Sequence, residues 1–390
     1  MTEPSAADDG SRTMRDLAAD LGVADPEIAH AEADGTLALL VVERLVVGEP
    51  GIFTQDDVIA RSGLGDDARK FWRALGFPDP QPDERTFSSI DLEMLQMVDA
   101  MIRLELIERD GALQLARVIG SSMQRIAQAQ IDAIAARLEA EGPDADPERA
   151  LRRAETLLPT MPRVLEYAWR RHMQGAVRRR VVREHLAEDG PAPRAVGFAD
   201  LVGFTTLSQE LDDRELGEVV DRFETTTFEL VTGHGGRVVK MIGDEVMFEV
   251  ADLTSAALLS LDLADAFHQD DSVNDIRVGL AYGPALAREG DLFGPTVNLA
   301  SRLVGIAYAG AVVTSTDVRA ALEGDERFAF KSLRPRYLKN IGRVQLVALR
   351  RADDTSEGMA ERARRRRRVF GERLAALASQ PDEGGDRTSA

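Results

Sequence analysis

The sequence predicts an α+β protein in which an all-helical N-terminal domain is followed by an α/β sandwich domain. Apolar residues recur at three- and four-residue steps through roughly the first 140 residues, which is the period of amphipathic helices. The charge balance changes sign near residue 150, and from Arg194 onwards short apolar strands alternate with helices. We therefore expect a helical regulatory domain over 1–150, a helical linker over 151–193, a sandwich domain over 194–350 and a polar, partly disordered tail over 351–390.

The composition limits the possible functions. The chain has 390 residues, a net charge of −19 and no cysteine. The acidic charge argues against nonspecific nucleic-acid binding, and the lack of cysteine excludes disulfides, thiolate catalysis and cysteine-ligated zinc. No apolar run reaches the roughly 18 residues that a transmembrane helix needs, and the N-terminus has no signal-peptide pattern. We therefore expect a cytoplasmic protein with no nucleic-acid partner and no integral membrane association.

The N-terminal half shows helices but no obvious catalytic residues. One long amphipathic helix is expected over Gln114–Glu139, and a second helical stretch runs from Pro147 to about Glu188. Residues 53–64 have the spacing of a helix-turn-helix motif. Because residues 1–150 carry 30 acidic and 14 basic side chains, we favour a protein-contacting role for this motif over DNA binding.

The second half alternates strands and helices. Arg237–Ile242 and Glu245–Val250 are expected to form a β-hairpin that turns at Gly243 and Asp244. The other expected strands cover 195–199, 276–281, a segment near 312 and 344–349, and the expected helices cover 211–231, 254–268 and 297–307. This alternation predicts a compact α+β sandwich.

Two aspartates lie where a predicted apolar strand meets a glycine turn. Asp200 follows the strand 195–199 and precedes Gly203, and Asp244 lies in the hairpin turn. Carboxylate oxygens suit hard divalent cations, and a glycine loop lets backbone N–H groups approach a phosphate. Taken singly, Asp200 could cap the helix that begins near Thr205, and Asp244 could merely fill a turn. The two together indicate a metal-assisted phosphoryl or nucleotidyl transfer site.

A polar pair marks the predicted helix 297–307. Asn298 and Arg302 are four residues apart, which places them on one helix face. A fixed arginine could offset the charge that develops on a phosphate during transfer, although a surface polar pair is the alternative. Asp291, shortly before this helix, could accept a hydrogen bond from an exocyclic amine.

Taken together, these segments resemble the catalytic domain of class III nucleotidyl cyclases. The resemblance rests on Phe198–Thr205, Lys240–Glu245 and Asp291–Arg302, whose order and spacing agree with that family over roughly residues 194–350. It implies a ferredoxin-like α/β sandwich preceded by the helical domain.

The resemblance also implies a role for each matched position. The metal-binding group, which would hold two Mg²⁺ or Mn²⁺ ions per site, consists of Asp200, Leu201 and Asp244. The substrate-binding group consists of Lys240 and Asp291 at the adenine ring, Gly203, Phe204 and Thr205 in the phosphate loop, and Lys339 at the triphosphate. The catalytic group consists of Asn298, which would orient the ribose, and Arg302, which would stabilise the transition state.

The implied reaction converts ATP to 3′,5′-cyclic AMP and pyrophosphate. A lysine can donate to adenine N1 and an aspartate can accept from its N6 amine, whereas guanine reverses both demands, so Lys240 with Asp291 favours ATP. Lys240 and Asp244 straddle a two-residue turn, so one adenine pocket and one metal pair cannot easily share the same copy. The resemblance accordingly implies composite sites in a homodimer, in which one protomer supplies the metal-binding aspartates and the other supplies the base-reading and catalytic residues. A monomer should then be inactive.

The N-terminal half resembles the helical regulatory domain of some actinobacterial cyclases of a pH-sensing type. Our hypothesis is a switch helix around Pro162–Glu188 that carries His172 and His185 among several arginines. Histidine titrates near neutral pH, and basic neighbours make its charged state costlier. Protonation could therefore bias the helix between two packings, whereas the alternative is that both histidines are ordinary exposed residues.

Two other functions remain open at this point. Gly243–Glu245 is similar to the signature of diguanylate cyclases, but Ile242 and Val246 depart from that signature. A transcriptional regulator built on residues 53–75, with a degenerate cyclase fold as its dimeriser, would leave the matched cyclase positions unused.

Overall fold

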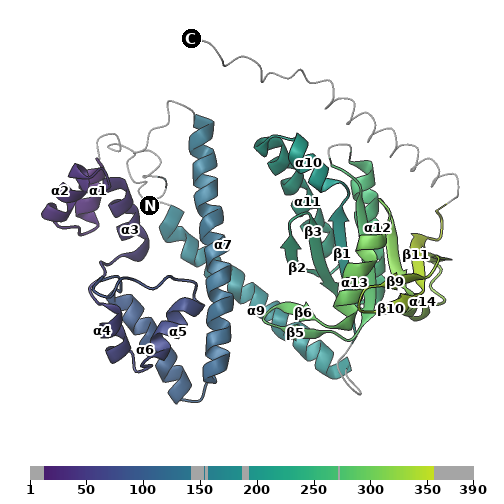
Figure 1. Ribbon diagram of the computed structural model, residues 1–390, viewed down its shortest axis with the longest axis horizontal. Coiled ribbons are helices and arrows are strands. Elements are labelled where there is room, and N and C mark those ends of the chain that lie inside the picture. Colours follow the sequence, from purple (N-terminus) through teal and green to yellow (C-terminus); the bar gives the residue numbers. More distant parts are fainter. Residues whose placement is uncertain (1–12, 142–152, 154–156, 187–192, 271–272, 355–390) are drawn as a thin grey trace, which may run out of the picture. The chain divides into compact units, whose positions relative to one another are not determined.

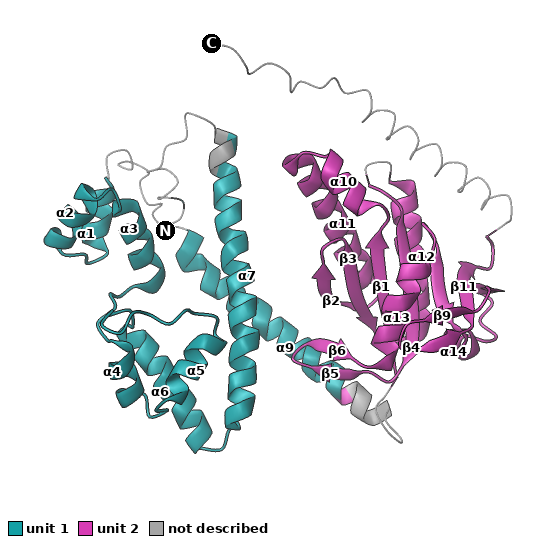
Figure 2. Ribbon diagram, viewed as in Figure 1, with its two compact units in different colours: residues 1–180 teal, residues 181–390 magenta. Residues whose placement is uncertain are grey.

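The computed structural model divides the chain into two compact units, residues 1–180 and residues 181–390 (Figure 2). It describes residues 13–141, 153, 157–186, 193–270 and 273–354. Most of the predicted tail, from residue 355 onwards, and the start of the second predicted helical stretch lie outside these ranges. The predicted fold class is confirmed, because a helical region is followed by an α/β domain with a mixed sheet.

Apart from an isolated β-bridge between Phe53 and Phe87, the described elements of the first unit are helices. They are α1 (Met14–Asp20), α2 (Asp25–Ala33), α3 (Leu37–Val47), α4 (Gln55–Arg61), α5 (Asp67–Ala74), α6 (Ser89–Arg103), α7 (Arg109–Glu141), the short 3₁₀ helix η2 (Leu158–Thr160) and α9 (Met161–Leu186) (Figure 1). The α1–α3 group packs around Ile28 and Val41, and the α4–α7 group packs around Phe71 and Phe87. Helix α7 begins five residues before the predicted Gln114, because its first turns pack on α5 through Ala112 and Ala116.

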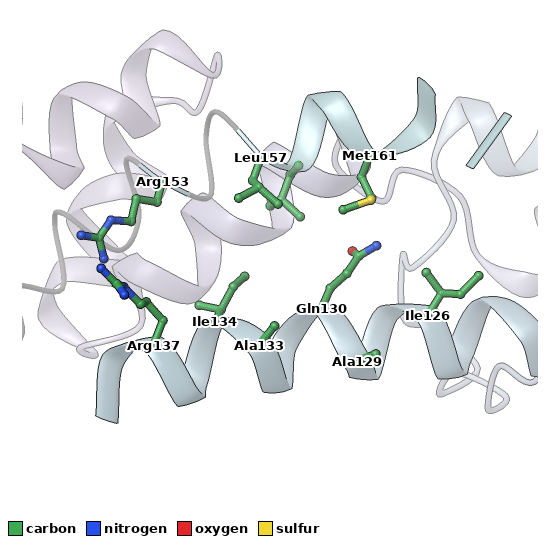
Figure 3. A pocket seen from close by; sticks show the side chains of 10 residues that line it. Ile126, Ala129, Gln130, Ala133, Ile134, Arg137, Arg153, Leu157 and Met161 are labelled. Carbon is green, nitrogen blue, oxygen red and sulfur yellow. The ribbon is translucent and has the colours of Figure 1, made fainter. Parts of the chain in front are cut away.

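An apolar cavity of about 590 Å³ lies beside the C-terminal half of α7 (Figure 3). Its walls are Ile126, Gln130 and Ile134 from α7 and Leu157 and Met161 from the facing segment, with two arginines at one end. The described lining contains no carboxylate, so this cavity is not a candidate for the metal-assisted site that the sequence predicts.

The second unit is built on a seven-stranded sheet with the order β2-β3-β1-β4-β7-β11-β8. Its strands are β1 (Arg194–Leu201), β2 (Arg237–Ile242), β3 (Glu245–Val250), β4 (Ile276–Gly283), β7 (Val312–Ser315), β8 (Phe328–Ser332) and β11 (Leu346–Arg351). Two small hairpins accompany it, β5 (Leu286–Arg288) with β6 (Asp291–Phe293) and β9 (Arg336–Leu338) with β10 (Gly342–Val344). Neighbouring strands are antiparallel except for the parallel pair of β4 and β7.

Helices cover both faces of this sheet. They are α10 (Phe204–Glu210), α11 (Asp213–Gly233), α12 (Leu253–Gln269), α13 (Pro295–Ile306) and α14 (Thr316–Ala321). We call the apolar cluster under α11 and α12 the helix-pair core, and the cluster under α13 the α13 core. Strand β1 is buried along its whole length and alternates between them, with Ala199 and Leu201 in the helix-pair core and Val196 and Phe198 in the α13 core.

The sequence analysis missed five strands and the short helix α14. The strands β5, β6, β9 and β10 have three residues each, which is too short to show a period. Strand β8, at the edge of the sheet, was also not predicted. The predicted helix 211–231 is in fact α11, which begins at Asp213 behind an Asp212 cap, and α10 is a separate helix before it. None of the described helices is long and apolar enough to cross a bilayer.

Candidate active site

Three carboxylates gather where β1 ends and β3 begins. Asp200 lies opposite Glu245 on β3, and Asp244 occupies the adjoining turn, where its backbone carbonyl accepts the N–H of Leu201 at 3.0 Å. The strand alternation of β1 puts Asp200 on the face of the sheet that α13 covers. This β1–β3 pairing therefore brings together the two aspartates that the sequence assigned to metal binding.

A basic residue from the other neighbouring strand contacts this group. Arg277 lies opposite Asp200 on β4, and its Nε donates to Asp200 Oδ2 at 2.6 Å. Sequence reasoning missed both Arg277 and Glu245. The available signal was weak: Arg277 is a charged residue in an otherwise apolar strand, and Glu245 directly follows Asp244 at the start of another.

The charges of this group are unbalanced, although no three His, Cys, Asp or Glu side chains of the described residues are arranged so that they could hold a metal ion together. Burial and, after it, the charges of Asp200 and Asp244 together raise the pKa of Glu245 to about 7, while Arg277 opposes the shift. Burial also raises the pKa of Asp200, against the hydrogen bond and charge of Arg277. The one guanidinium of Arg277 does not balance the three carboxylates, so the group has excess negative charge. This charge and the carboxylate oxygens are both features that suit hard divalent cations. The Leu201 side chain is buried in the helix-pair core, so only its backbone is available to a metal.

The predicted phosphate loop follows β1 directly. Gly203 has a φ of 79°, a left-handed conformation that favours glycine, and α10 starts at the next residue. The loop is held from both sides at Val202, whose N–H donates to the Asp275 carbonyl at 2.9 Å and whose carbonyl accepts from Asn274 Nδ2 at 2.8 Å. The Phe204 side chain packs on the helix-pair core, so a phosphate could use only the backbone at that position. Thr205 is exposed.

The two predicted base-reading residues contact each other. Lys240 Nζ donates to Asp291 Oδ2 at 2.6 Å, and both side chains are partly exposed. Asp291 is further fixed by the N–H of Leu292, which donates to its Oδ1 at 2.7 Å. This pair offers a lysine donor beside a carboxylate acceptor, which is the arrangement that adenine requires.

The remaining predicted residues lie on α13 and on the β9–β10 hairpin. Asn298 and Arg302 are exposed and four residues apart on α13, whose other side carries Ala300 and Leu303 into the α13 core. Lys339 is exposed in the β9–β10 turn, next to Asn340 with a φ of 65°.

The described residues thus form two contacting groups rather than one. Asp200, Asp244, Glu245 and Arg277 interact with one another, and Lys240 interacts with Asp291. Within the part of the chain that the structure describes, no hydrogen bond or ion pair joins the two groups. Nor does any such contact join the side chains of Asn298, Arg302 or Lys339 to either group among these residues. The assignment of roles to these residues stays a prediction.

Comparisons with known proteins identify the family. Residues 192–350 match the model of the adenylate and guanylate cyclase catalytic domain. An adenylate cyclase of Streptomyces coelicolor is 37% identical over 306 residues, which cover 76% of this chain and 78% of that protein. The solved catalytic core of a rhodopsin-guanylyl cyclase is 23% identical, with 41% of this chain and 96% of that chain covered and a TM-score of 0.39. The chain belongs to the class III adenylate cyclases, which are lyases, and it carries an N-terminal extension.

The relation to the pH-sensing type has a narrower basis. A pH-sensitive adenylate cyclase of Mycobacterium tuberculosis is 39% identical over 171 residues, which cover 42% of this chain and 43% of that protein. The match to the Streptomyces coelicolor protein covers 76% of this chain, which is more than the cyclase domain and everything after it could supply. The match therefore extends into the N-terminal helices. The extension is therefore shared with an adenylate cyclase, whereas pH sensing stays a hypothesis.

Proposed function

We propose that this chain converts ATP to 3′,5′-cyclic AMP and pyrophosphate at composite sites of a homodimer, with two Mg²⁺ or Mn²⁺ ions at each site. The observation that carries the proposal is the group of Asp200, Asp244 and Glu245, whose mutual repulsion and burial raise the pKa of Glu245 to about 7. Such a group is costly unless cations balance it, and phosphoryl chemistry on a nucleoside triphosphate requires such cations.

The ions would be held by the side chains of Asp200 and Asp244 and by the backbone at Leu201. When bound, they lower the pKa of the attacking 3′-hydroxyl and offset the charge of the α-phosphate. Arg277 neutralises part of the charge of Asp200 in the metal-free enzyme. The Gly203 loop offers backbone N–H groups to the triphosphate.

The other residues select and orient the substrate. Lys240 donates to adenine N1, and Asp291 accepts from the N6 amine. On α13, Asn298 orients the ribose, and Arg302 offsets the negative charge that grows on the phosphoryl oxygens. Lys339 contacts the triphosphate as a point charge. Lys240 lies on the seven-stranded sheet, and Asn298 and Arg302 lie on α13, which packs on that sheet, so the cost of orienting these three is low.

The separate contacts of the two groups support a dimer. The metal-binding group lies at the turn end of the β2–β3 hairpin, whereas Lys240 is directed from β2 towards the β5–β6 hairpin. We propose that ATP bridges the metal-binding group of one protomer and the Lys240–Asp291 pair of its partner, so that each homodimer has two sites.

Mixing two inactive variants tests this proposal. Asp200→Ala and Arg302→Ala should each abolish production of cyclic AMP from ATP with Mn²⁺. When they are mixed, random pairing leaves one intact site in the heterodimers, so about a quarter of wild-type activity should return. Arg319→Ala, which removes an exposed arginine on α14, is the control and should keep full activity. No recovery on mixing, with heterodimers shown by tagged pull-down, would exclude composite sites.

We also propose that the N-terminal extension regulates the cyclase through α9. This helix crosses the division between the two units, and His172 is exposed on it beside Arg171. The side chain of His185 lies outside the described residues. Replacing both histidines with asparagine should flatten the pH–activity profile of the full chain. An unchanged profile would exclude this pH switch but would leave the cyclase reaction untouched.

A further inference from the structure

Strand β2 contains an extra residue between Arg237 and Lys240. In the β2–β3 ladder Arg237 lies opposite Glu249, but the register shifts between Val238 and Lys240. Residues three apart in a regular strand point to opposite faces, and a bulge cancels this alternation. The packing agrees, because Val238 contacts the helix-pair core and Val239 contacts the α13 core. Arg237 and Lys240 are therefore able to reach the same side of the sheet.

Both side chains contact the β5–β6 hairpin, which lies beside β2 (Figure 1). Arg237 Nη1 donates to the Gly290 carbonyl at 2.9 Å, and Lys240 Nζ donates to Asp291 Oδ2 at 2.6 Å. The two contacted residues are adjacent in the chain. A movement of the turn at Gly290 would therefore move the Asp291 carboxylate away from Lys240.

Arg237 is held in place from behind by a buried carboxylate. Its Nε donates to Glu249 Oε2 at 2.7 Å, and Glu249, which is only 6% exposed, also forms an ion pair with Arg194. Burial raises the pKa of Glu249, but Arg237 and Arg194 lower it more, so its pKa stays below the usual range. Glu249 is thus a fixed anion that orients the Arg237 guanidinium.

The turn that Arg237 contacts has an unfavourable backbone of its own. Glu289 has a φ of 54° and Gly290 has a φ of 82°, between the paired residues Arg288 and Asp291. A two-residue hairpin turn of this kind requires positive φ at both positions, which suits glycine but costs energy at glutamate. A strained residue persists only where surrounding contacts hold it. The hydrogen bond from Arg237 is such a contact.

We infer that Arg237, oriented by Glu249, is a positioning residue for base selection, which fixes the β5–β6 turn so that the Asp291 carboxylate stays beside Lys240. The inference rests on the proposed function, in which this pair reads adenine. A displaced carboxylate no longer accepts from the N6 amine, so the enzyme loses discrimination between ATP and GTP rather than its chemistry at phosphorus.

The test compares two variants of the full chain with a control. Arg237→Met removes both hydrogen bonds, and Arg237→Lys keeps a cation near Glu249 but cannot contact Glu249 and Gly290 together. For both we expect the ratio of kcat/KM for ATP to that for GTP to fall about tenfold or more, mainly through a higher KM for ATP. Arg319→Met, which removes an exposed arginine on α14, away from the hairpin, should leave the ratio unchanged. A preserved ratio in both Arg237 variants would overturn the inference.

A second readout does not depend on activity. Amide hydrogen exchange in residues 286–293 should speed up in both Arg237 variants, because the turn loses its external contact, and should not change in Arg319→Met. Adding Glu289→Gly to Arg237→Met relieves the turn and should restore part of the selectivity. If the hairpin exchanges as in the wild type, or if Glu289→Gly restores nothing, Arg237 does not act through the turn.

Direct variants of the base-reading pair separate this inference from the proposed function. If Lys240→Met and Asp291→Ala leave the ratio of ATP to GTP unchanged, the pair does not read the base and the proposed function fails at that step. If they change the ratio while both Arg237 variants retain it, only the positioning role of Arg237 fails.

Discussion

Replacing Glu245 with glutamine should stabilise the metal-free enzyme at alkaline pH. Glu245 is partly buried opposite Asp200 and beside Asp244, and its pKa is raised from 4.5 to about 7. The causes are burial first and then the charges of the two aspartates, against which Arg277 acts. Glutamine has nearly the same shape and no charge, so the substitution removes the repulsion while keeping the packing.

The sign and the size follow from the pKa shift. A carboxyl whose pKa is higher in the folded state favours folding while it is protonated, and this contribution is lost as the pH rises from 4.5 through about 7. The full shift would correspond to about 3 kcal/mol, and solvent screening of this partly exposed group reduces it to about 1–2 kcal/mol. At pH 8 the metal-free Glu245→Gln variant should therefore melt about 3–6 °C above the wild type.

The assay is thermal unfolding of the full chain with EDTA, at pH 8 and at pH 5. The gain should shrink towards zero at pH 5, where wild-type Glu245 is itself largely protonated. Glu326→Gln, which changes an exposed carboxylate of the same unit, is the control and should shift little at either pH. Added Mn²⁺ should stabilise the wild type more than the variant. The electrostatic reasoning would be refuted if wild type and Glu245→Gln melted at the same temperature at pH 8. It would also be refuted if the variant melted below the wild type by the same amount at both pH values.

Four further substitutions have opposed or separable outcomes. Gly279→Ala would place a Cβ 2.3 Å from a backbone nitrogen of α13, so urea unfolding should show a loss of about 1–3 kcal/mol or more, with loss of activity. Gly305→Ala, on the exposed side of α13 with nothing within 4 Å, should instead stabilise by about 0.5–1 kcal/mol. Arg277→Met removes the cation that competes with a metal ion at Asp200, so Mn²⁺ should raise the melting temperature at a concentration up to about tenfold lower than in the wild type. An unchanged midpoint of this Mn²⁺ titration would contradict the prediction. Glu249→Ala leaves its two arginine partners without their carboxylate acceptor, so the free energy of unfolding measured in urea should fall by about 3–5 kcal/mol. A fall of less than about 1 kcal/mol would show that water replaces the carboxylate.

The sequence located the paired aspartates because local signals mark them. Asp200 and Asp244 each end an apolar run at a glycine, and strand alternation and turn chemistry are both readable over a few residues. Glu245 and Arg277 escaped because their proximity to Asp200 depends on the strand order β3-β1-β4. That order is a non-local pairing, which no short segment encodes.

The base-reading pair shows a second limit. Counting alternation along Arg237–Ile242 predicts that Arg237 and Lys240 point to opposite faces. The bulge reverses this, and nothing in the local sequence marks the extra residue. The expectation that Lys240 and Asp291 act together came from the family resemblance. The contact of 2.6 Å between them, in the structure, gives that expectation a geometric basis.

The sheet separates stability from chemistry by its two faces. On β1 the residues that alternate with Asp200 face α11 and α12 and are wholly apolar, so that side stabilises the unit. The opposite face carries apolar side chains under α13 but also Asp200, Arg277 and Glu249, which are charged groups in partly or fully buried positions. Glu249 is balanced by two arginines, whereas the group around Asp200 has one arginine for three carboxylates. The uncompensated group is therefore the one at which ligand binding should increase the stability of the fold, and it is the same group to which the proposed reaction assigns the cations.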